Sequence, residues 1–272
     1  MKSERVSQLR GTEWGLMTRI SRSSVTSRPA LLGAVVMLAL TSASVAAADD
    51  GPGPFGVTAD VVATRQSARV GALFGADRVD RLAGGHFCTA SVVHSPRGDL
   101  VVTAAHCVSG AGELVFVPGY RDGKAPYGVW KVTQRFLPDG WAEGEDEDSD
   151  LAFVTVAGPG GRPVEDVVGA NRLATGVATG ATAVTVTGYP DSREVPISCT
   201  NKPTLHSTTQ QRIDCPDFTG GTSGSPWVNG DHQVVGVLGG HEQGGSTADT
   251  SYSVVLGSEA AQLYRQATGG DR

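Results

Sequence analysis

Three short segments of the chain carry residue types that could together break a bond at a carbonyl carbon. An apolar run ends at His106, and another apolar run begins directly after Asp150. The third segment, Gly220–Pro226, is rich in glycine and has Ser223 near its middle. A serine hydroxyl is a poor nucleophile at neutral pH unless a neighbouring base takes its proton. We therefore expect His106 to act as the general base for Ser223 in an acyl-transfer reaction.

An acidic side chain has to hold such a histidine in one tautomer and stabilise its positive charge. Four acidic residues lie between positions 146 and 150, and only Asp150 runs straight into an apolar segment. We expect Asp150 to orient His106, because a buried strand would fix its position. The glycine turn around Ser223 can point backbone N–H groups at a developing oxyanion. The three segments therefore contain every part that acyl transfer requires.

The elements that position these segments are predicted to be strands. From Val70 onward, short apolar runs rich in valine and threonine alternate with turns, and the chain holds 37 glycines and 14 prolines. Regular strand spacing of this kind favours an antiparallel β-sandwich or β-barrel. Only Ser258–Ala267 has a helical pattern, with Ser258 as the expected N-cap. Residues 158–179 are poor in strand signals, so we expect them to connect two halves.

The first 48 residues have the layout of a secretory signal peptide. Arg19, Arg22 and Arg28 precede the apolar run Ala30–Leu40, and small residues follow it as far as Ala48. The run has 11 residues, whereas a helix needs about 20 to span a bilayer. We therefore expect a secreted, extracellular protein with no membrane association once the signal is cleaved. Residues 49–69 begin rich in glycine, proline and aspartate, which predicts a propeptide or a flexible arm.

Charge and cysteine usage narrow the list of partners. Without residues 1–48 the chain keeps 16 basic and 26 acidic residues, a net charge of −10, which excludes nucleic acid as the main partner. Four cysteines in an exported protein are expected to be paired. No C-x-x-C or H-x-x-x-H spacing occurs, so we expect no metal and no cofactor. The acidic run 143–150 is interpreted as a solvated loop, with a calcium site as the alternative.

Three sequence strings together resemble the chymotrypsin/trypsin superfamily of serine proteases. They are TAAHC at residues 103–107, DLA at 150–152 and SGSP at 223–226, in the order His, Asp, Ser. The SGSP string is most similar to the bacterial glutamyl-endopeptidase and actinobacterial trypsin-like branch, and the resemblance extends from about Val70 to the C-terminus. An α/β-hydrolase would need glycine where Ser225 stands, and subtilisins have the order Asp, His, Ser.

The resemblance implies two six-stranded antiparallel β-barrels with the active site in the cleft between them. The first barrel would cover about residues 70–160 and the second about 175–257, followed by a short C-terminal helix at about 258–267. The first barrel would supply His106 and Asp150, and the second would supply Ser223. Backbone N–H groups of Gly221 and Ser223 would form the oxyanion hole. The family's disulfides would correspond to Cys88–Cys107 and Cys199–Cys215.

The sequence departs from the animal members of this superfamily just before the nucleophile. Those members carry an aspartate there, which binds the new N-terminus after activation, whereas this chain has Thr222. That ion pair cannot form here, and we expect a competent oxyanion hole without it. Val70, preceded by Arg69, nevertheless resembles a mature N-terminus. This likeness predicts that residues 49–69 are removed.

Two features predict different substrate preferences. In the trypsin pattern, the residue six positions before the nucleophile lies at the base of the S1 pocket, and here that residue is Asp217. An acidic residue at the bottom of the S1 pocket predicts cleavage after arginine or lysine, which is our first expectation. The walls of the pocket are expected to come from Gly239, Gly240 and His241. A histidine at this position of the wall resembles the S1 pockets of proteases that bind glutamate, so cleavage after glutamate is the alternative.

The leading hypothesis is a monomeric endopeptidase that acts on protein or peptide substrates through an acyl-enzyme. A second hypothesis, from a different class, is a catalytically silent homologue that binds peptides or another protein. Silent homologues have usually lost a triad residue, whereas this chain keeps His106, Asp150 and Ser223. A third hypothesis is an esterase on the same fold. Comparison of ester and amide substrates would separate the first hypothesis from the third.

Overall fold

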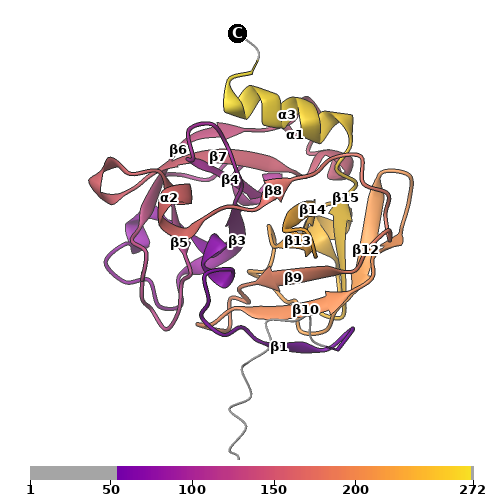
Figure 1. The fold of residues 1–272 in the computed structure, drawn as a ribbon, viewed down its shortest axis with the longest axis horizontal. Helices are drawn as coiled ribbons and strands as arrows, with labels where there is room; N and C mark the ends of the chain where they lie inside the picture. The colour runs from indigo at the N-terminus through magenta and orange to yellow at the C-terminus, as the bar shows by residue number, and fades with distance from the viewer. Residues whose placement is uncertain (1–53, 271–272) are drawn as a thin grey trace, which may run out of the picture. The chain divides into compact units, whose positions relative to one another are not determined.

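The structure is a computed structural model that describes residues 54–270 (Figure 1). The predicted signal peptide at residues 1–48 and the beginning of the predicted propeptide lie outside the described residues. Strands dominate the described part of the chain. The predicted all-β, chymotrypsin-like fold with a short C-terminal helix is confirmed.

The first half of the fold is a closed six-stranded antiparallel barrel. Strands follow one another around it in the order β2-β3-β4-β7-β6-β5. Alternate residues of β4 face opposite sides: Val101 packs into the barrel interior, and Leu100 and Val102 pack outside it. Both faces of β4 are therefore buried, which explains why its sequence is apolar without alternation. The strands are β2 (Val70–Gly75), β3 (His86–Val92), β4 (Leu100–Thr103), β5 (Leu114–Pro118), β6 (Trp130–Phe136) and β7 (Ala152–Ala157).

The second half contains nine strands, divided between two sheets. The larger sheet has the order β1-β10-β9-β13-β14-β8, and the smaller one has the order β11-β12-β15. The larger sheet is formed by β1 (Thr58–Asp60), β8 (Arg172–Leu173), β9 (Val184–Gly188), β10 (Ile197–Asn201), β13 (Pro226–Asn229) and β14 (Gln233–Val237). The smaller sheet is formed by β11 (Thr204–Leu205), β12 (Gln210–Asp214) and β15 (Thr250–Val254).

The hydrogen bonding of this second half differs from the single closed six-stranded barrel that the resemblance implies. A bridge between Leu238 and Ser253 joins the two sheets. Directly after it, the chain turns at Gly239 and Gly240 into a 3₁₀ turn, so β14 and β15 cannot continue as a ladder. In addition, β8 runs parallel to β14, because it lies in the connection between the halves and not in a hairpin.

Three α-helices and six 3₁₀ turns complete the described fold. Helix α3 lies along β6 and β7 (Figure 1), where Ala260 and Leu263 pack with Phe153. Its N-cap is Gly257, so Ser258 is the first helical residue and not the expected cap. No helix among the described residues is long and apolar enough to cross a membrane. The helices are α1 (Asp139–Gly144), α2 (Val164–Val168) and α3 (Ser258–Thr268); the 3₁₀ turns are η1 (Ser67–Arg69), η2 (Ala76–Arg78), η3 (Ala105–Cys107), η4 (Glu147–Ser149), η5 (Pro159–Gly161) and η6 (His241–Gly244).

The segment before β2 contacts the second half of the fold. Strand β1 pairs antiparallel with β10, and the Thr58 hydroxyl donates a hydrogen bond to the Pro216 carbonyl at 2.6 Å. Val70, the residue after the predicted cleavage point, is buried at the start of β2. Removal of residues 49–69 would therefore take β1 away from the sheet. That removal stays a prediction.

Candidate active site

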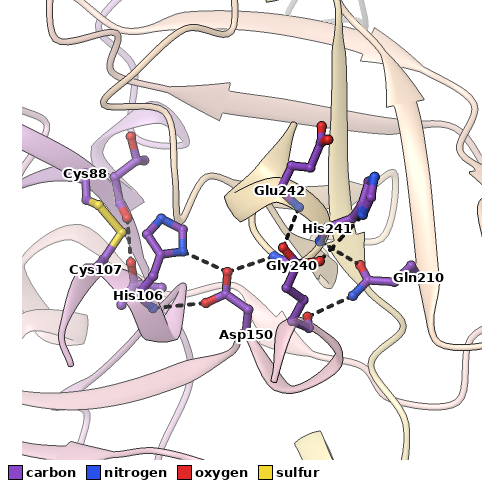
Figure 2. Close-up of polar contacts among 11 residues, drawn as sticks. Cys88, His106, Cys107, Asp150, Gln210, Gly240, His241 and Glu242 are labelled. Carbon is purple, nitrogen blue, oxygen red and sulfur yellow. Dashed lines mark hydrogen bonds and ion pairs between the residues drawn. A yellow bond between two sulfur atoms is a disulfide. The ribbon is translucent and has the colours of Figure 1, made fainter. Parts of the chain in front are cut away.

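The position of His106 is set by a disulfide at the end of β4. The strand ends at Thr103, and the chain then enters η3, which contains His106. Cys107 in the same turn is bonded to Cys88 on β3, with a Cα–Cα distance of 6.1 Å (Figure 2). The histidine side chain is only 13% exposed, so it can move little from this place. The structure contains the second disulfide, Cys199–Cys215, as well.

Asp150 is fully buried and accepts three hydrogen bonds. The backbone N–H of His106 donates to Oδ1 at 3.0 Å, and its ring Nδ1 lies 2.7 Å from Oδ2. The backbone N–H of Gly240 also donates to Oδ2, at 2.7 Å (Figure 2). Donors on every side suit an ionised carboxylate. With the proton of His106 on Nδ1, its Nε2 keeps a lone pair and can act as a base.

Two consecutive glycines close the second half of the fold over Asp150. A Cβ atom on Gly239 would lie 2.8 Å from Asp150 Oδ2, and one on Gly240 would lie 2.4 Å from Gln210 Oε1. Gly240 also has a left-handed φ of +79°. Neither position tolerates a side chain, so this pair has to be glycine. From the sequence we placed these glycines only in the substrate pocket, and their contact with Asp150 was missed.

The turn that carries Ser223 is held to the first half of the fold through β3. The backbone N–H of Thr89 donates to the Ser223 carbonyl at 2.7 Å. Thr89 follows Cys88, and Cys88 is bonded to the neighbour of His106. Ser223 is therefore bonded to β3, the strand that also anchors the histidine turn. Ser223 itself is partly exposed. Within residues 54–270, no hydrogen bond joins the Ser223 hydroxyl to His106.

The backbone around Ser223 contains the two N–H groups predicted for the oxyanion hole. Gly221 has a φ of +89°, and a Cβ atom there would lie 2.5 Å from the Asp191 nitrogen. Among the described residues, neither the Gly221 N–H nor the Ser223 N–H donates to a protein acceptor. Both are thus available to an external oxygen, as an oxyanion hole requires.

Asp217 and His241, the two predicted determinants of specificity, lie in different surroundings. Asp217 is exposed, with a φ of +70°, two residues beyond the Cys199–Cys215 disulfide. The ring of His241 stacks on His206 with 4.7 Å between centroids. In the part of the chain that the structure describes, no hydrogen bond or ion pair connects Asp217 with His241. The two residues are therefore not brought together into one binding group.

Tyr252 and Glu147 complete the surroundings of His241. Its ring is nearly perpendicular to that of Tyr252, at 77°, with 4.8 Å between centroids, and its Nδ1 is 3.5 Å from Glu147 Oε2. Glu147 belongs to the acidic run that we interpreted as a solvated loop, and its Oε1 accepts a hydrogen bond from the Glu242 N–H at 2.9 Å. The acidic run therefore docks onto the turn that follows Gly240.

Possible metal ligands cluster at one place within residues 54–270. This cluster consists of Cys88, His106 and Cys107. The two cysteines form a disulfide, so neither offers the thiolate that a metal would need. The remaining ligand is the histidine that faces Asp150. These three residues are therefore the disulfide and the histidine of η3, and they do not form a zinc site.

The barrel fold and the paired His106 and Asp150 define the class of a trypsin-like serine peptidase. The chain matches the family of the Trypsin-like peptidase domain over residues 88–237, which is more than half of its 272 residues. It therefore belongs to this family. A glutamyl endopeptidase from Bacillus licheniformis is 31% identical over 133 residues, which cover 46% of this chain and 41% of that protein. The chain thus matches less than half the length of this curated relative.

Solved structures of bacterial proteases share the fold. The protease Anisep from Arthrobacter nicotinovorans is 27% identical with a TM-score of 0.67, covering 78% of this chain and 99% of its own. The thermostable serine protease AL20 from an extremophilic microorganism is 27% identical with a TM-score of 0.66, covering 76% and 100%. A Glu endopeptidase in complex with MPD is 19% identical with a TM-score of 0.63, covering 80% and 99%, which is a likeness of fold alone.

Proposed function

We propose that this chain is a secreted serine endopeptidase with Ser223 as nucleophile, His106 as general base and Asp150 as the group that orients the base. The observation that carries the proposal is the buried Asp150 carboxylate, which faces Nδ1 of His106 at 2.7 Å. His106 held in this way presents Nε2 as a base. Ser223, in its glycine turn, is bonded to Thr89 on β3, the strand to which the histidine turn is joined by a disulfide. The family supports proteolysis as the reaction.

The reaction runs through an acyl-enzyme. His106 Nε2 takes the Ser223 proton while Oγ bonds to the scissile carbonyl carbon, and the N–H groups of Gly221 and Ser223 stabilise the oxyanion. The C–N bond then breaks, and His106 gives the proton to the leaving amine. Water, deprotonated by His106, attacks the ester carbonyl carbon. The bond to Ser223 Oγ then breaks, Oγ takes the proton back from His106, and the acid product leaves. Asp150 stays ionised throughout.

Hydrolysis of peptide substrates by the purified protein tests this proposal. Wild-type protein is expected to cleave an amide substrate, and Ser223→Ala is expected to lose that activity. Binding of peptides without turnover by the wild type would favour the silent homologue. Activity on esters with none on amides would favour the esterase.

Specificity has two candidates. Cleavage after arginine or lysine follows if the Asp217 carboxylate reads the substrate side chain. Cleavage after glutamate is favoured by the name of the relative from Bacillus licheniformis and by the stacked His206–His241 pair, which could face an acidic side chain. Cleavage of a peptide library by Asp217→Asn and by His241→Ala separates the two preferences. Only the variant that removes the residue in contact with the substrate side chain should change the preference.

Secretion is supported by the two disulfides, which persist in oxidising compartments. We expect cleavage near Ala48, a monomer in solution and a protein or peptide as the only partner. Mass spectrometry of protein recovered from the culture medium gives the mature N-terminus. An N-terminus at Val70 would support removal of residues 49–69, and an active protein that begins at Asp49 would contradict it.

A further inference from the structure

The loop around Ser223 lacks the ion pair that orders the corresponding loop in animal members of the superfamily, because Thr222 stands before the nucleophile. The hydroxyl of Thr222 is buried and donates a hydrogen bond to the Thr219 carbonyl at 2.7 Å. Some other group must therefore orient the peptides that carry the N–H groups of Gly221 and Ser223. In a trans peptide the C=O and the N–H point in opposite directions. A carbonyl that is held firmly on one side aims the N–H of its peptide to the other.

Four consecutive carbonyls of the loop, from Gly220 to Ser223, are held by hydrogen bonds. The Gly220 carbonyl accepts from the Asp191 N–H at 2.7 Å, which orients the peptide that carries the Gly221 N–H. The Thr222 carbonyl accepts from the Ser225 hydroxyl at 2.6 Å and from its N–H at 3.0 Å, which orients the peptide that carries the Ser223 N–H. Both oxyanion donors are thus aimed by bonds on the other side of their own peptides.

Thr89 on β3 holds the other two carbonyls. Its hydroxyl donates to the Gly221 carbonyl at 3.0 Å, and its N–H donates to the Ser223 carbonyl at 2.7 Å. The same hydroxyl accepts a hydrogen bond from the Tyr189 N–H at 2.9 Å. Tyr189 lies two residues before Asp191, so one hydroxyl fixes both the loop and the segment that holds Gly220. Thr89 is fully buried, and water cannot replace it.

The site of the Ser225 hydroxyl is similarly closed. Ser225 is fully buried, and a Cβ atom on Gly188 would lie 2.1 Å from its Oγ. Gly188 therefore leaves the space that this hydroxyl occupies. Animal members of the superfamily have glycine at the position of Ser225, in the string SGGP. The chain thus adds one hydroxyl to the loop while it lacks the aspartate before the nucleophile.

We propose that the hydroxyls of Thr89 and Ser225 are positioning groups that hold the oxyanion hole in its active geometry without an activation ion pair. This proposal rests on the proposed function, since an oxyanion hole has a role only in acyl transfer. Neither hydroxyl touches the substrate. The Ser225 hydroxyl acts directly, through the Thr222 carbonyl, on the peptide that carries the Ser223 N–H. The Thr89 hydroxyl holds the peptide between the two donors, through the Gly221 carbonyl, and also holds Tyr189, which leads to the Asp191 N–H that binds the Gly220 carbonyl. The loop is consequently preformed as soon as the two halves of the fold are in place.

Thr89→Val tests the proposal, because valine keeps the shape of threonine and removes the donor. We expect kcat to fall about 10- to 100-fold with KM nearly unchanged, somewhat less than the loss of a whole oxyanion donor. The affinity for a peptide aldehyde, which forms a tetrahedral adduct, should fall by the same factor as kcat/KM. Thr89→Ser keeps the hydroxyl and should restore most of the rate. Ser225→Ala should lower kcat in the same direction.

Thr155→Val is the matched control. Thr155 is also a buried threonine, 3% exposed, and its hydroxyl lies 2.8 Å from that of Thr133 on the neighbouring strand β6. Its loss should lower the melting temperature and leave kcat unchanged. If Thr89→Val lowers only the melting temperature, like this control, the positioning role is refuted.

A readout that does not depend on turnover keeps this test separate from that of the proposed function. In the NMR spectrum of the wild-type protein, the Gly221 and Ser223 amides should each give one sharp resonance. In Thr89→Val the Thr222 amide, whose peptide Thr89 holds directly, and the Gly221 amide, held through Tyr189 and Asp191, should shift or broaden, and in Thr89→Ser both should stay. Unchanged loop resonances in Thr89→Val would overturn the proposal, whether or not the wild-type protein hydrolyses peptides.

Discussion

At the scale of single residues, the Asp150 carboxylate is held on every side. It is fully buried, and its two oxygens accept from two backbone N–H groups and one histidine ring. A neutral side chain at this place would leave buried donors without a charged partner and would let His106 adopt the other tautomer. In the proposed mechanism, the ability of His106 to act as a base thus depends on the buried charge of Asp150.

Asp150→Asn is expected to lower kcat strongly while the protein stays folded. The same change in other Ser-His-Asp enzymes lowers kcat by about 10⁴, because the amide favours the wrong tautomer of the histidine. Steady-state kinetics at neutral pH, with circular dichroism as the check on folding, measure this. Asp148→Asn is the matched control and should keep nearly full activity, since Asp148 is exposed and faces Gln210. Equal losses in both variants would contradict the role of Asp150.

Gly239→Ala is expected to impair catalysis through sterics alone. The added methyl group would meet Asp150 Oδ2 at 2.8 Å and the Ala104 side chain at 3.1 Å, so the carboxylate has to move away from His106. We expect kcat to fall by at least about 10-fold, the value that corresponds to 1.4 kcal/mol in the activation barrier. Gly112→Ala, where a Cβ atom meets nothing within 4 Å, should have wild-type kinetics. A fully active Gly239→Ala would refute the contact.

At the scale of elements, the 3₁₀ turn η3 and strand β3 act as one unit because a disulfide joins them. The bond links Cys88 on β3 to Cys107 beside His106, across 19 residues. The second disulfide closes a loop of similar length, 16 residues, away from the histidine. The two bonds should therefore stabilise the fold about equally and differ in their effect on the site.

Removal of each disulfide by paired Cys→Ala substitutions separates these effects. Each loss should lower the free energy of unfolding by about 3 kcal/mol in the chain-entropy treatment of loops of this size. Only the variant without Cys88–Cys107 should also lower kcat per folded molecule, because it frees the histidine turn. Urea unfolding and active-site titration provide the two numbers. A larger kcat loss on removal of Cys199–Cys215 would contradict this account.

The division of the second half into two sheets could not be predicted at the level of elements. Strand periodicity and turn residues predicted an antiparallel sandwich or barrel and the C-terminal helix, because these signals are local in sequence. The division into two barrels was implied by the resemblance. The separation of β14 from β15 depends instead on Gly239 and Gly240, which close over a carboxylate 90 residues earlier in the chain. Nothing in the local pattern of a Gly-Gly pair identifies such a partner.

The candidate site shows the same limit. His106, Asp150 and Ser223 could be proposed as site residues from the sequence, because their segments have characteristic strings. The groups that hold them could not. Thr89 lies inside an ordinary apolar strand, and its bond to Gly221 spans 132 residues. Its role appears only when the two halves of the fold are packed together.

At the scale of the whole molecule, a polar contact links the first half to the loop before β10. Tyr120 follows β5, and its hydroxyl donates a hydrogen bond to the Glu194 carboxylate, which also accepts from the Gly84 N–H at 2.8 Å. Partial burial alone would raise the pKa of Glu194, but the hydrogen bonds from Tyr120 and Gly84 outweigh it and lower the pKa below its usual value. The folded state therefore stabilises the charged form of Glu194 relative to the protonated form.

This pKa direction predicts a loss of stability in acid. A group whose pKa is lower in the folded state stabilises the fold above its unfolded pKa, about 4.3 for glutamate, and loses that contribution as the pH falls through the folded value. Glu194→Gln should therefore lower the free energy of unfolding at pH 7 and make a smaller difference at pH 3. Urea unfolding at both pH values measures this. A difference that grows toward acid would have the wrong sign and would contradict the assignment.

We propose that Ser223, His106, Asp150 and the oxyanion donors form one working acyl-transfer site. Mass spectrometry after exposure of the mature protein to a fluorophosphonate tests it most directly, because the reagent needs an activated serine and an oxyanion hole but no knowledge of the substrate. We expect one covalent adduct, located on Ser223 and absent in Ser223→Ala. A mature, folded protein that gains no adduct would contradict it and would favour the peptide-binding homologue.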